Sequence, residues 1–432
     1  MSLGTTRGTG FGRVLRGPRR SLGAALATAA VLVAAPALTP PAAAEERCDV
    51  NNPRLIDSEP SLPLIRMGVP QAWQQVGTTG KGVTVAVVDS GVEADNRHFT
   101  TIGETVLPGR SFVPGDESGD GRTDVYAHGT GVAGTIAAGP VEGSKVYGAA
   151  WRAKILPVRV YARESVNGEE VPEAERPSTV RMADGIRWAA LKGADVINVS
   201  MSTQSDENLD YLEAAVRFAV SRDAVIVASG GNRPTGTEPH SARYPAAFPG
   251  VIGVAASDPS DQITESTVHG SHIDVAAPGQ RVLTTFLDAD DCIVGADQPY
   301  TSYATGYVSG VAALLRERYP KESAETIAYR IMASADRPQR GERDDLRGWG
   351  IVQAYQALTM TLDPNRLGPP FPGAEEEDRT RATPVVGPVR AATDPLEPVR
   401  QQALWWSILG AGLVSLALVL RPWAHRHLAR RD

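Results

Sequence analysis

Short apolar runs alternate with segments of helical periodicity through the middle of the chain. The runs are rich in valine and isoleucine, as is typical of strands buried on both faces of a sheet. They are Val83–Val88, Ile155–Val160, Val196–Val199, Val225–Ala228 and Val251–Ala255. Helical periodicity falls between or after them, at Gly129–Ala138, Val180–Leu191, Leu209–Val220 and Tyr303–Arg316. The alternation predicts an α/β fold, with a mainly parallel sheet and helices on both faces.

A longer apolar run lies near the N-terminus. Five arginines precede Leu22–Leu38, and the small residues Ala42–Ala44 stand before Glu45. This is the pattern of a secretory signal peptide, so we interpret residues 1–44 as a cleaved leader. The alternative is an uncleaved signal anchor.

A second long apolar run lies near the C-terminus. Residues 403–420 are uncharged, and about 18–20 helical residues just span a bilayer core of about 30 Å. Trp405 and Trp406 stand at one border of the run and Trp423 at the other, where aromatic rings settle at membrane interfaces. Arginines follow in residues 421–432, which predicts a single transmembrane helix with a basic cytoplasmic tail and an extracytoplasmic body. A buried core helix is the alternative, but only the basic tail follows it.

Prolines recur from Leu362 to Arg400, with the acidic run Glu375–Asp378 among them. Such a stretch cannot bury enough apolar surface to fold, so we interpret 362–402 as an extended linker. The predicted organisation is a signal peptide (1–44), an N-terminal arm that wraps the body (45–70), a folded domain (71–361), the linker (362–402), the membrane helix (403–420) and the tail (421–432).

Cys48 and Cys292 are the two cysteines of the chain. In an exported protein such a pair is usually a disulfide, and a single intramolecular pairing exists. The bond would hold the N-terminal arm beside the segment that leads into Ser302.

The charge balance excludes one class of partner. The 43 basic and 50 acidic side chains give a net charge of −7, which argues against binding to nucleic acid. The chain has no cysteine–histidine metal cluster and no phosphate-binding glycine fingerprint, so we expect neither a metal nor another cofactor. The spacing of Asp116, Glu117, Asp120 and Asp124 fits no calcium loop, and we interpret this segment as surface.

Four polar residues stand where a parallel sheet places its ligands, at the carboxyl ends of strands and the starts of helices. Asp89 ends one apolar run and Asn232 follows another, while His128 and Ser302 stand at helix starts. Taken singly, each is an ordinary turn, loop or cap residue. Together, in the order Asp, His, Ser, they indicate nucleophilic catalysis, with amide donors near Ser302 for a developing oxyanion.

The segments around these residues resemble the subtilisin family of serine proteases. The matching motifs are Val87–Val92, His128–Thr130, Gly231–Asn232, Thr301–Thr305 and Gly348–Ala354. The resemblance implies peptide hydrolysis by acyl transfer, with Ser302 as nucleophile, His128 as general base and acid, and Asp89 orienting the imidazole. Asn232 and the backbone amide of Ser302 would stabilise the oxyanion.

The same resemblance implies the substrate contacts. Ser200, Met201 and Ser202 match the segment that pairs with substrate backbone and forms one wall of the primary pocket. Ser202 stands where glycine is frequent, which should narrow that pocket. The opposite wall would be formed by Ser229, Gly230 and Gly231. Packing at strand ends is the alternative role for these residues.

Three further features bear on activity. The acidic loop Tyr161–Pro177 should lie near the substrate cleft, as a surface loop or as a determinant of substrate choice. Tyr300 replaces the usual glycine and would strain the backbone if its φ were positive. Gly306 replaces the usual proline and is expected to loosen the start of the helix.

More narrowly, the chain resembles the mycosins, membrane-anchored subtilases that accompany type VII secretion systems of actinobacteria. The resemblance rests on the signal sequence, Ile155–Val160, the Gly-Trp-Gly segment, the linker and the single C-terminal helix. It implies an extracytoplasmic serine endopeptidase that processes proteins of such a system. A structural subunit that stabilises a membrane secretion complex, with proteolysis secondary, is the alternative. A tethered degradative protease is a third possibility.

Overall fold

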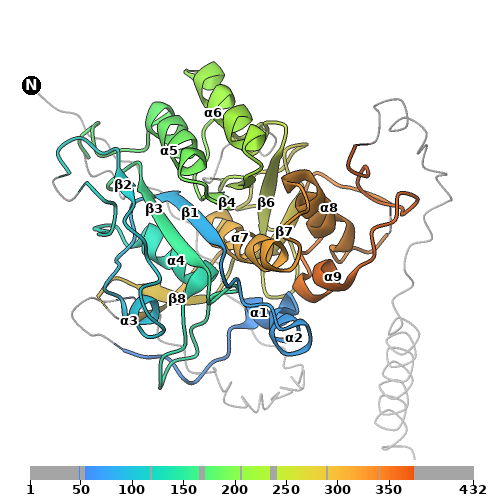
Figure 1. Cartoon of the computed structure of the whole chain (residues 1–432), viewed down its shortest axis with the longest axis horizontal. Coiled ribbons are helices and arrows are strands. Elements are labelled where there is room, and N and C mark those ends of the chain that lie inside the picture. Colours follow the sequence, from blue (N-terminus) through green and yellow to red (C-terminus); the bar gives the residue numbers. More distant parts are fainter. Residues whose placement is uncertain are drawn as a thin grey trace, which may run out of the picture. The chain divides into compact units, whose positions relative to one another are not determined.

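A seven-stranded parallel sheet forms the centre of the computed structural model. The structure describes residues 48, 54–116, 119–164, 171–204, 207–233, 241–288, 290–339 and 341–373. The strands follow the order β2-β3-β1-β4-β5-β6-β7 (Figure 1). They are β1 (Thr84–Asp89), β2 (Arg110–Ser111), β3 (Lys154–Arg159), β4 (Val196–Val199), β5 (Val225–Ser229), β6 (Val251–Ser257) and β7 (Val275–Pro278). The predicted mainly parallel sheet is confirmed.

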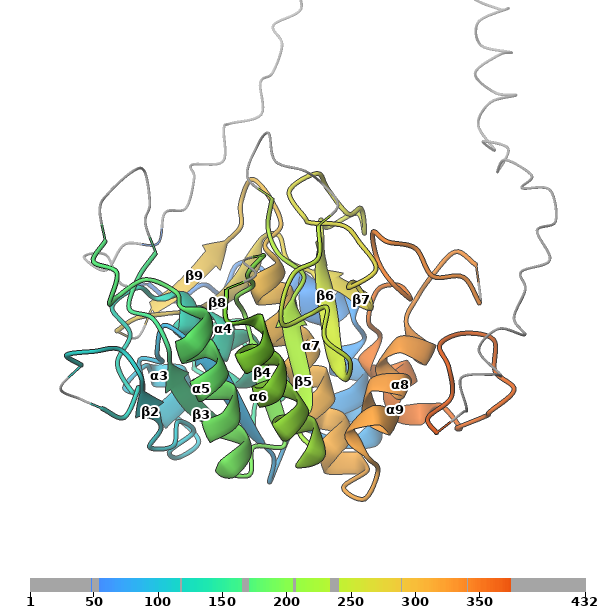
Figure 2. The same ribbon diagram turned by 90° about the horizontal axis from the view of Figure 1, so that it is seen from above.

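Helices cover both faces of this sheet. Figure 2 shows α5 (Thr179–Leu191) and α6 (Leu209–Ser221) on one face, with α4 (His128–Ala137) and α7 (Thr301–Arg318) on the other. Alternate residues of β1 point to opposite faces, because successive side chains of a strand do so. Val85 and Val87 pack in the core beneath α4 and α7, whereas Ala86 and Val88 pack beneath α5 and α6. The five strands and four helices expected from the sequence are all present, with ends within two residues of the prediction.

The elements that the sequence pattern did not predict are mostly short. They are β2, β7, the antiparallel hairpin β8 (Val282–Phe286) and β9 (Asp290–Val294), the helices α1 (Leu62–Arg66), α2 (Val69–Gln71), α3 (Arg97–Thr100), α8 (Ala324–Ser334) and α9 (Ala354–Thr359), and the π-helical turn η1 (Ala72–Val76). Apart from α8 they have two to six residues, which is too few to display a clear period, so tertiary contacts determine their structure. The longest, α8, has a Ser323 side chain that caps its first turn.

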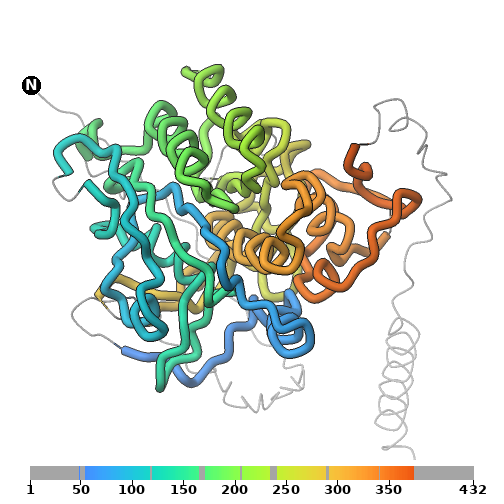
Figure 3. Tube along the Cα trace, in the orientation of Figure 1, coloured from blue at the N-terminus to red at the C-terminus, as the bar shows by residue number. Residues whose placement is uncertain are grey.

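Helices α4 and α7 pack closely although they are distant in sequence (Figure 3). A Cβ atom on Gly306 would lie 2.1 Å from Thr135 Oγ1 and 3.1 Å from the carbonyl oxygen of Val132. Helix α7 is continuous through Gly306, and the absence of a side chain there allows α4 to approach closely. Because His128 and Ser302 stand in the first turns of these helices, their packing sets the separation of the two residues.

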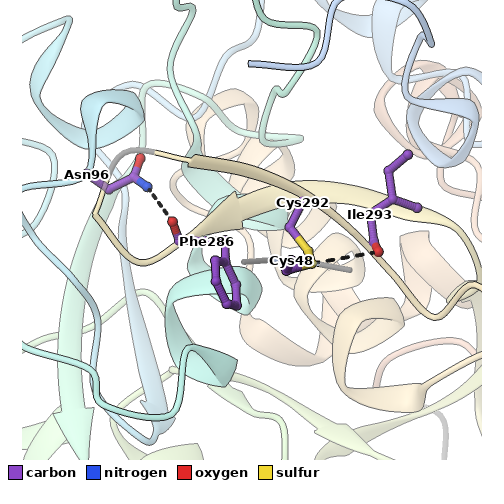
Figure 4. The surroundings of a disulfide bond; sticks show 5 residues. All are labelled: Cys48, Asn96, Phe286, Cys292 and Ile293. Carbon is purple, nitrogen blue, oxygen red and sulfur yellow. Dashed lines mark hydrogen bonds between the residues drawn. A yellow bond between two sulfur atoms is a disulfide. The ribbon is translucent and has the colours of Figure 1, made fainter. Parts of the chain in front are cut away.

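The N-terminal arm is tied to the β8–β9 hairpin. A disulfide joins Cys48 to Cys292 on β9, with 5.4 Å between the Cα atoms, as predicted (Figure 4). Asp291 also accepts a hydrogen bond of 2.7 Å from the Ile56 amide of the arm at its Oδ2 atom, and its own amide donates to the carbonyl oxygen of Arg54 over 2.9 Å. Disulfides that close long loops typically contribute about 2–5 kcal/mol to stability. The hairpin in turn supports α4, because Thr284 Oγ1 and Thr285 Oγ1 donate to its carbonyl groups over 2.6 and 2.7 Å.

Within the described residues, no helix has the length and apolar character needed to cross a membrane. The predicted signal peptide (1–44), the membrane helix (403–420) and the tail (421–432) all lie outside those residues. The linker prediction (362–402) is covered only as far as residue 373.

Candidate active site

Asp89 and His128 form a hydrogen-bonded pair at the carboxyl end of the sheet. Asp89 is the last residue of β1 and is fully buried, while His128 opens α4 and is 21% exposed at its side chain. His128 Nδ1 lies 2.7 Å from Asp89 Oδ1. The same carboxylate oxygen accepts from the amide of Ser90 over 2.7 Å and from the hydroxyl of Tyr161 over 2.9 Å. The carboxylate is therefore fixed from several directions.

The first turn of α4 is held by a second buried carboxylate, Asp124. Its oxygens accept from the amides of Ala127 and Thr130 over 3.0 and 2.9 Å, and from Ser90 Oγ over 2.9 Å. The prediction that this residue belongs to a solvated surface segment is wrong, because its carboxylate is enclosed by the donors of the helix start. Burial raises the pKa of Asp124. Among the described residues, no group of acidic, histidine or cysteine side chains could hold a metal ion.

Ser302 is the second residue of α7 and is almost completely buried. The backbone of Tyr300 just before the helix has φ −118° and ψ 128°, so its side chain causes no strain there. Asn232 holds the same turn, since its Oδ1 atom accepts from Thr301 N over 2.9 Å and from Thr301 Oγ1 over 3.0 Å. An amide whose oxygen is engaged in this way keeps its NH₂ group for another acceptor.

A cavity of about 340 Å³ joins most of the predicted site residues. Its lining includes His128, Ser302, Asn232, Ser200, Met201, Ser202 and Ser229. Asp89 is bonded to His128 behind this lining, whereas Gly230 and Gly231 are buried and do not line the cavity. Two larger hollows, of about 720 and 820 Å³, are lined by no histidine. The candidate site is therefore identified by the residues that line the cavity and not by the volume of the cavity.

Two serines in this lining also position α7. Ser200 Oγ donates to the carbonyl oxygen of Ser302 over 3.2 Å, and Ser229 Oγ lies 2.7 Å from Thr301 Oγ1. Their hydroxyl groups therefore help to hold the first turn of the helix against the ends of β4 and β5. This role agrees with the packing at strand ends that was the alternative expectation for these residues.

The expectation that the loop Tyr161–Pro177 lies near the cleft is confirmed, because Glu164 and Pro177 line the cavity. Sequence reasoning missed the other lining residues, namely Ser178, Thr179, Met182, Thr203 and Arg243. Tyr161, which donates to Asp89, directly follows an apolar run predicted to be a strand. No local pattern marked Arg243.

The electrostatics of the pair favour a charged imidazole. Burial lowers the pKa of His128, but the charge and hydrogen bond of Asp89, followed by the charge of Glu164, raise it to about 9. Burial and the Asp89 carboxylate hold the pKa of Tyr161 well above its usual value, so this hydroxyl remains a donor. A base at His128 would therefore become available as the pH rises.

A second Asp–His–Ser set lies elsewhere in the fold. His98 Nε2 is 2.9 Å from Asp291 Oδ1, and Ser144 Oγ donates to Asp291 Oδ2 over 2.6 Å. His98 and Asp291 have fully buried side chains, and His98 Nδ1 is bound to the carbonyl oxygen of Gly139. This set braces the hairpin and the N-terminal arm, so residue types alone do not identify an active site.

Comparison with known proteins agrees with this geometry. Residues 80–350 match the subtilase family. The chain is 32% identical to mycosin-1 of Mycobacterium tuberculosis over 82% of each chain, and 34% identical to M-protease of Shouchella clausii over 68% of each chain. The crystal structure of MycP1 from Mycobacterium smegmatis matches with a TM-score of 0.61 and 27% identity, covering 75% of this chain and 92% of that one. A chain from the intact ESX-5 inner membrane complex gives a TM-score of 0.61 and 28% identity, covering 85% and 92%.

We expect His128 to titrate with a pKa of about 9, measurable from its ring protons by NMR. The raised pKa means that the Asp89–His128 pair stabilises the fold fully below about pH 6.5, and that this stabilisation is lost as the pH rises through about 9. Replacing Glu164 by Gln should lower the pKa of His128, because a negative charge that favours the imidazolium is removed.

Glu265→Gln is the matched control, since this exposed carboxylate pairs with Arg233 and does not line the cavity. It should leave the titration of His128 unchanged. This account of the electrostatics would be contradicted if the pKa of His128 were the same in the Glu164→Gln variant as in the wild-type protein, or if it were near 6.5 in the wild-type protein.

Proposed function

The chain belongs to the subtilase family and is a serine endopeptidase, and we propose that Asp89, His128 and Ser302 form its catalytic triad. The observation that carries this proposal is the 2.7 Å contact between His128 Nδ1 and Asp89 Oδ1, with Ser302 on the same cavity. An imidazole held through Nδ1 has its Nε2 atom free to accept a proton from a hydroxyl group.

In the proposed reaction, Ser302 Oγ attacks the carbonyl carbon of a peptide bond while His128 Nε2 takes the hydroxyl proton. Asp89 stabilises the imidazolium through Nδ1–H. The negative oxygen of the tetrahedral intermediate accepts hydrogen bonds from the Asn232 NH₂ group and the backbone amide of Ser302. His128 then protonates the leaving amine, and a water molecule activated by His128 hydrolyses the ester on Ser302.

An extended peptide is the substrate that suits this site. The segment Ser200–Ser202 follows β4 and the segment Ser229–Gly231 begins with the last residue of the adjacent strand β5, and both contribute to the cavity that contains Ser302. We infer that they form the two walls of the pocket for the residue on the amino side of the scissile bond. The side chain of Ser202 narrows the space between them.

Ser302→Ala should abolish peptide hydrolysis by the full-length protein in detergent, with a loss in kcat of about 10⁶-fold. Asn232→Ala should lower kcat by about 10²–10³-fold with little change in KM, because the amide acts only on the developing oxyanion. Hydrolysis of quenched-fluorescence peptides measures both effects, with circular dichroism as the folding control. Hydrolysis that persists in a folded Ser302→Ala variant would exclude Ser302 as the nucleophile.

We further propose that the enzyme is anchored in the cell membrane by residues 403–420, with its peptidase domain outside the cytoplasm. The sequence supports this through the signal peptide and the basic tail. Similarity to mycosins and to a chain of the periplasmic assembly from an ESX-5 inner membrane complex supports the same placement. On this basis the substrates are proteins of a type VII secretion system.

Protease added outside intact cells or spheroplasts should degrade the peptidase domain, while a tag placed after Asp432 stays protected until the membrane is permeabilised. The expectation follows from the arginines in residues 421–432, which favour retention in the cytoplasm. Western blotting for each end of the chain gives the readout. A tag that is cleaved in intact cells would reverse the proposed orientation.

A structural role is the second candidate function. It is favoured by the similar chain found within an intact ESX-5 inner membrane complex, where the match covers 85% of this chain. Such a subunit would stabilise the secretion complex through its folded surface, with proteolysis secondary.

Complementation of a deletion strain separates the two candidates. If processing is the essential function, the Ser302→Ala variant should fail to restore substrate maturation although the secretion complex assembles. Secretion assays, together with native gels of the complex, report the two outcomes. Full secretion with the Ser302→Ala protein, but none in the deletion strain, would favour the structural role.

A further inference from the structure

Arg243 is a buried cation for which the described residues provide no counterion. Its exposed fraction is 9%, and it lines the same cavity as Ser302. Within the described part of the chain no carboxylate pairs with its guanidinium, and its Nε atom has no hydrogen-bond partner. Burial lowers the pKa of Arg243, and no neighbouring carboxylate raises it.

Other buried arginines of the fold are paired. Arg159 lies 3.0 Å from Asp116, Arg316 lies 3.1 Å from Asp223 and Arg330 lies 2.6 Å from Glu322. A buried cation without such a partner is unfavourable, because it loses hydration and gains no compensating charge. Arg243 therefore differs from the other buried arginines, and a negatively charged ligand would supply the partner that it lacks.

The backbone places Arg243 where the two walls of the pocket meet. Tyr244, the next residue, exchanges two backbone hydrogen bonds of 2.8 Å with Thr203, which follows Ser202. A Cβ atom on Gly231 would lie 3.0 Å from Arg243 Cγ and 3.1 Å from Ser202 Oγ. Gly231 has φ +98°, so glycine suits both its conformation and this close approach. The stem of Arg243 thus packs against one wall and beside the other.

The charges around Arg243 do not neutralise it. Glu164 lines the cavity as well, but its charge acts on His128 and it forms no ion pair with Arg243. His272 lies close enough for Arg243 to lower its pKa, after the larger effect of burial, and a lowered pKa favours the neutral imidazole. This neighbour therefore supplies no negative charge to Arg243.

We propose that Arg243 makes the primary pocket selective for an acidic side chain, aspartate or glutamate, on the amino side of the scissile bond. The inference rests on the proposed function of the site and adds its substrate class. A guanidinium presents donors in a fork that matches a carboxylate, and such charge-assisted pairs are stronger than neutral hydrogen bonds. A neutral amide of the same size leaves the cation unpaired, and a basic side chain is repelled.

The test uses the full-length protein in detergent and quenched-fluorescence peptides that differ only at this position, with Asp, Glu, Asn, Gln, Ala, Phe or Lys. The better acidic peptide should exceed its amide counterpart in kcat/KM by about 10–100-fold. Arg243→Gln should remove this preference and raise kcat/KM for the glutamine peptide. Arg243→Lys should retain part of the preference, because lysine keeps the positive charge but lacks the paired N–H donors with which a guanidinium binds a carboxylate.

Arg233→Gln is the matched control, because Arg233 is paired with Glu265 over 2.6 Å and does not line the cavity. It should keep the acidic preference. Hydrolysis by wild-type protein that is equal for Glu and Gln peptides, or faster for neutral ones, would overturn the inference while leaving the serine protease assignment intact. This comparison needs no variant and does not depend on the folding of Arg243→Gln.

Failure of the proposed triad gives a different result. In that case no peptide is cleaved and a fluorophosphonate probe does not label Ser302. Binding of the uncleaved Glu and Gln peptides to Ser302→Ala protein, measured by calorimetry, then decides the inference alone. Tighter binding of the Glu peptide that is lost in the Ser302→Ala, Arg243→Gln double variant supports it, and equal affinity overturns it.

Discussion

Close packing of α4 against α7 controls the geometry of the site, because His128 and Ser302 stand in the first turns of these two helices. The approach requires small residues in contact. A Cβ atom on Gly306 would overlap Thr135 Oγ1, and one on Gly131 would lie 3.1 Å from Tyr303 Cε1. Any side chain at Gly306 would push the helices apart. The displacement would reach the hydroxyl and imidazole groups, where a shift of about 1 Å can cost 10²-fold in rate.

Support for this pair of helices extends to the start of the folded chain. The hairpin hydroxyls of Thr284 and Thr285 bond to α4, and the hairpin is itself joined to the N-terminal arm through Cys292 and Asp291. The buried contact between His98 and Asp291 also holds the hairpin in place. The arm therefore stabilises the helix that carries His128, although none of its described residues lines the cavity.

The sequence allowed the sheet and most of the reacting groups to be predicted because both are encoded locally. Apolar runs such as Val196–Val199 match their strands, and Asp89, His128 and Ser302 each stand at the end or the start of such an element. Tyr161 was missed because its contact with Asp89 depends on the pairing of β3 with β1, in which Asp89 lies opposite Arg159. Once that register is known, a residue two positions beyond Arg159 falls at the same edge of the sheet.

The position of Arg243 in the cavity could not be predicted from sequence patterns, for a related reason. Its place in the cavity depends on the bridge between Thr203 and Tyr244, which joins segments that flank different strands and carries no periodic signal.

The charge of Arg243 also bears on the kind of protease this is. A degradative enzyme gains from a roomy apolar pocket that accepts many side chains. Here Ser202 narrows the space, and a desolvated cation penalises every occupant that cannot supply a negative charge. Such a pocket lowers the number of cleavable bonds in an average protein, at the cost of weaker binding to most sequences. High selectivity with weak binding to most sequences suits an enzyme that meets few proteins at a membrane and must cleave its substrates without degrading the other proteins.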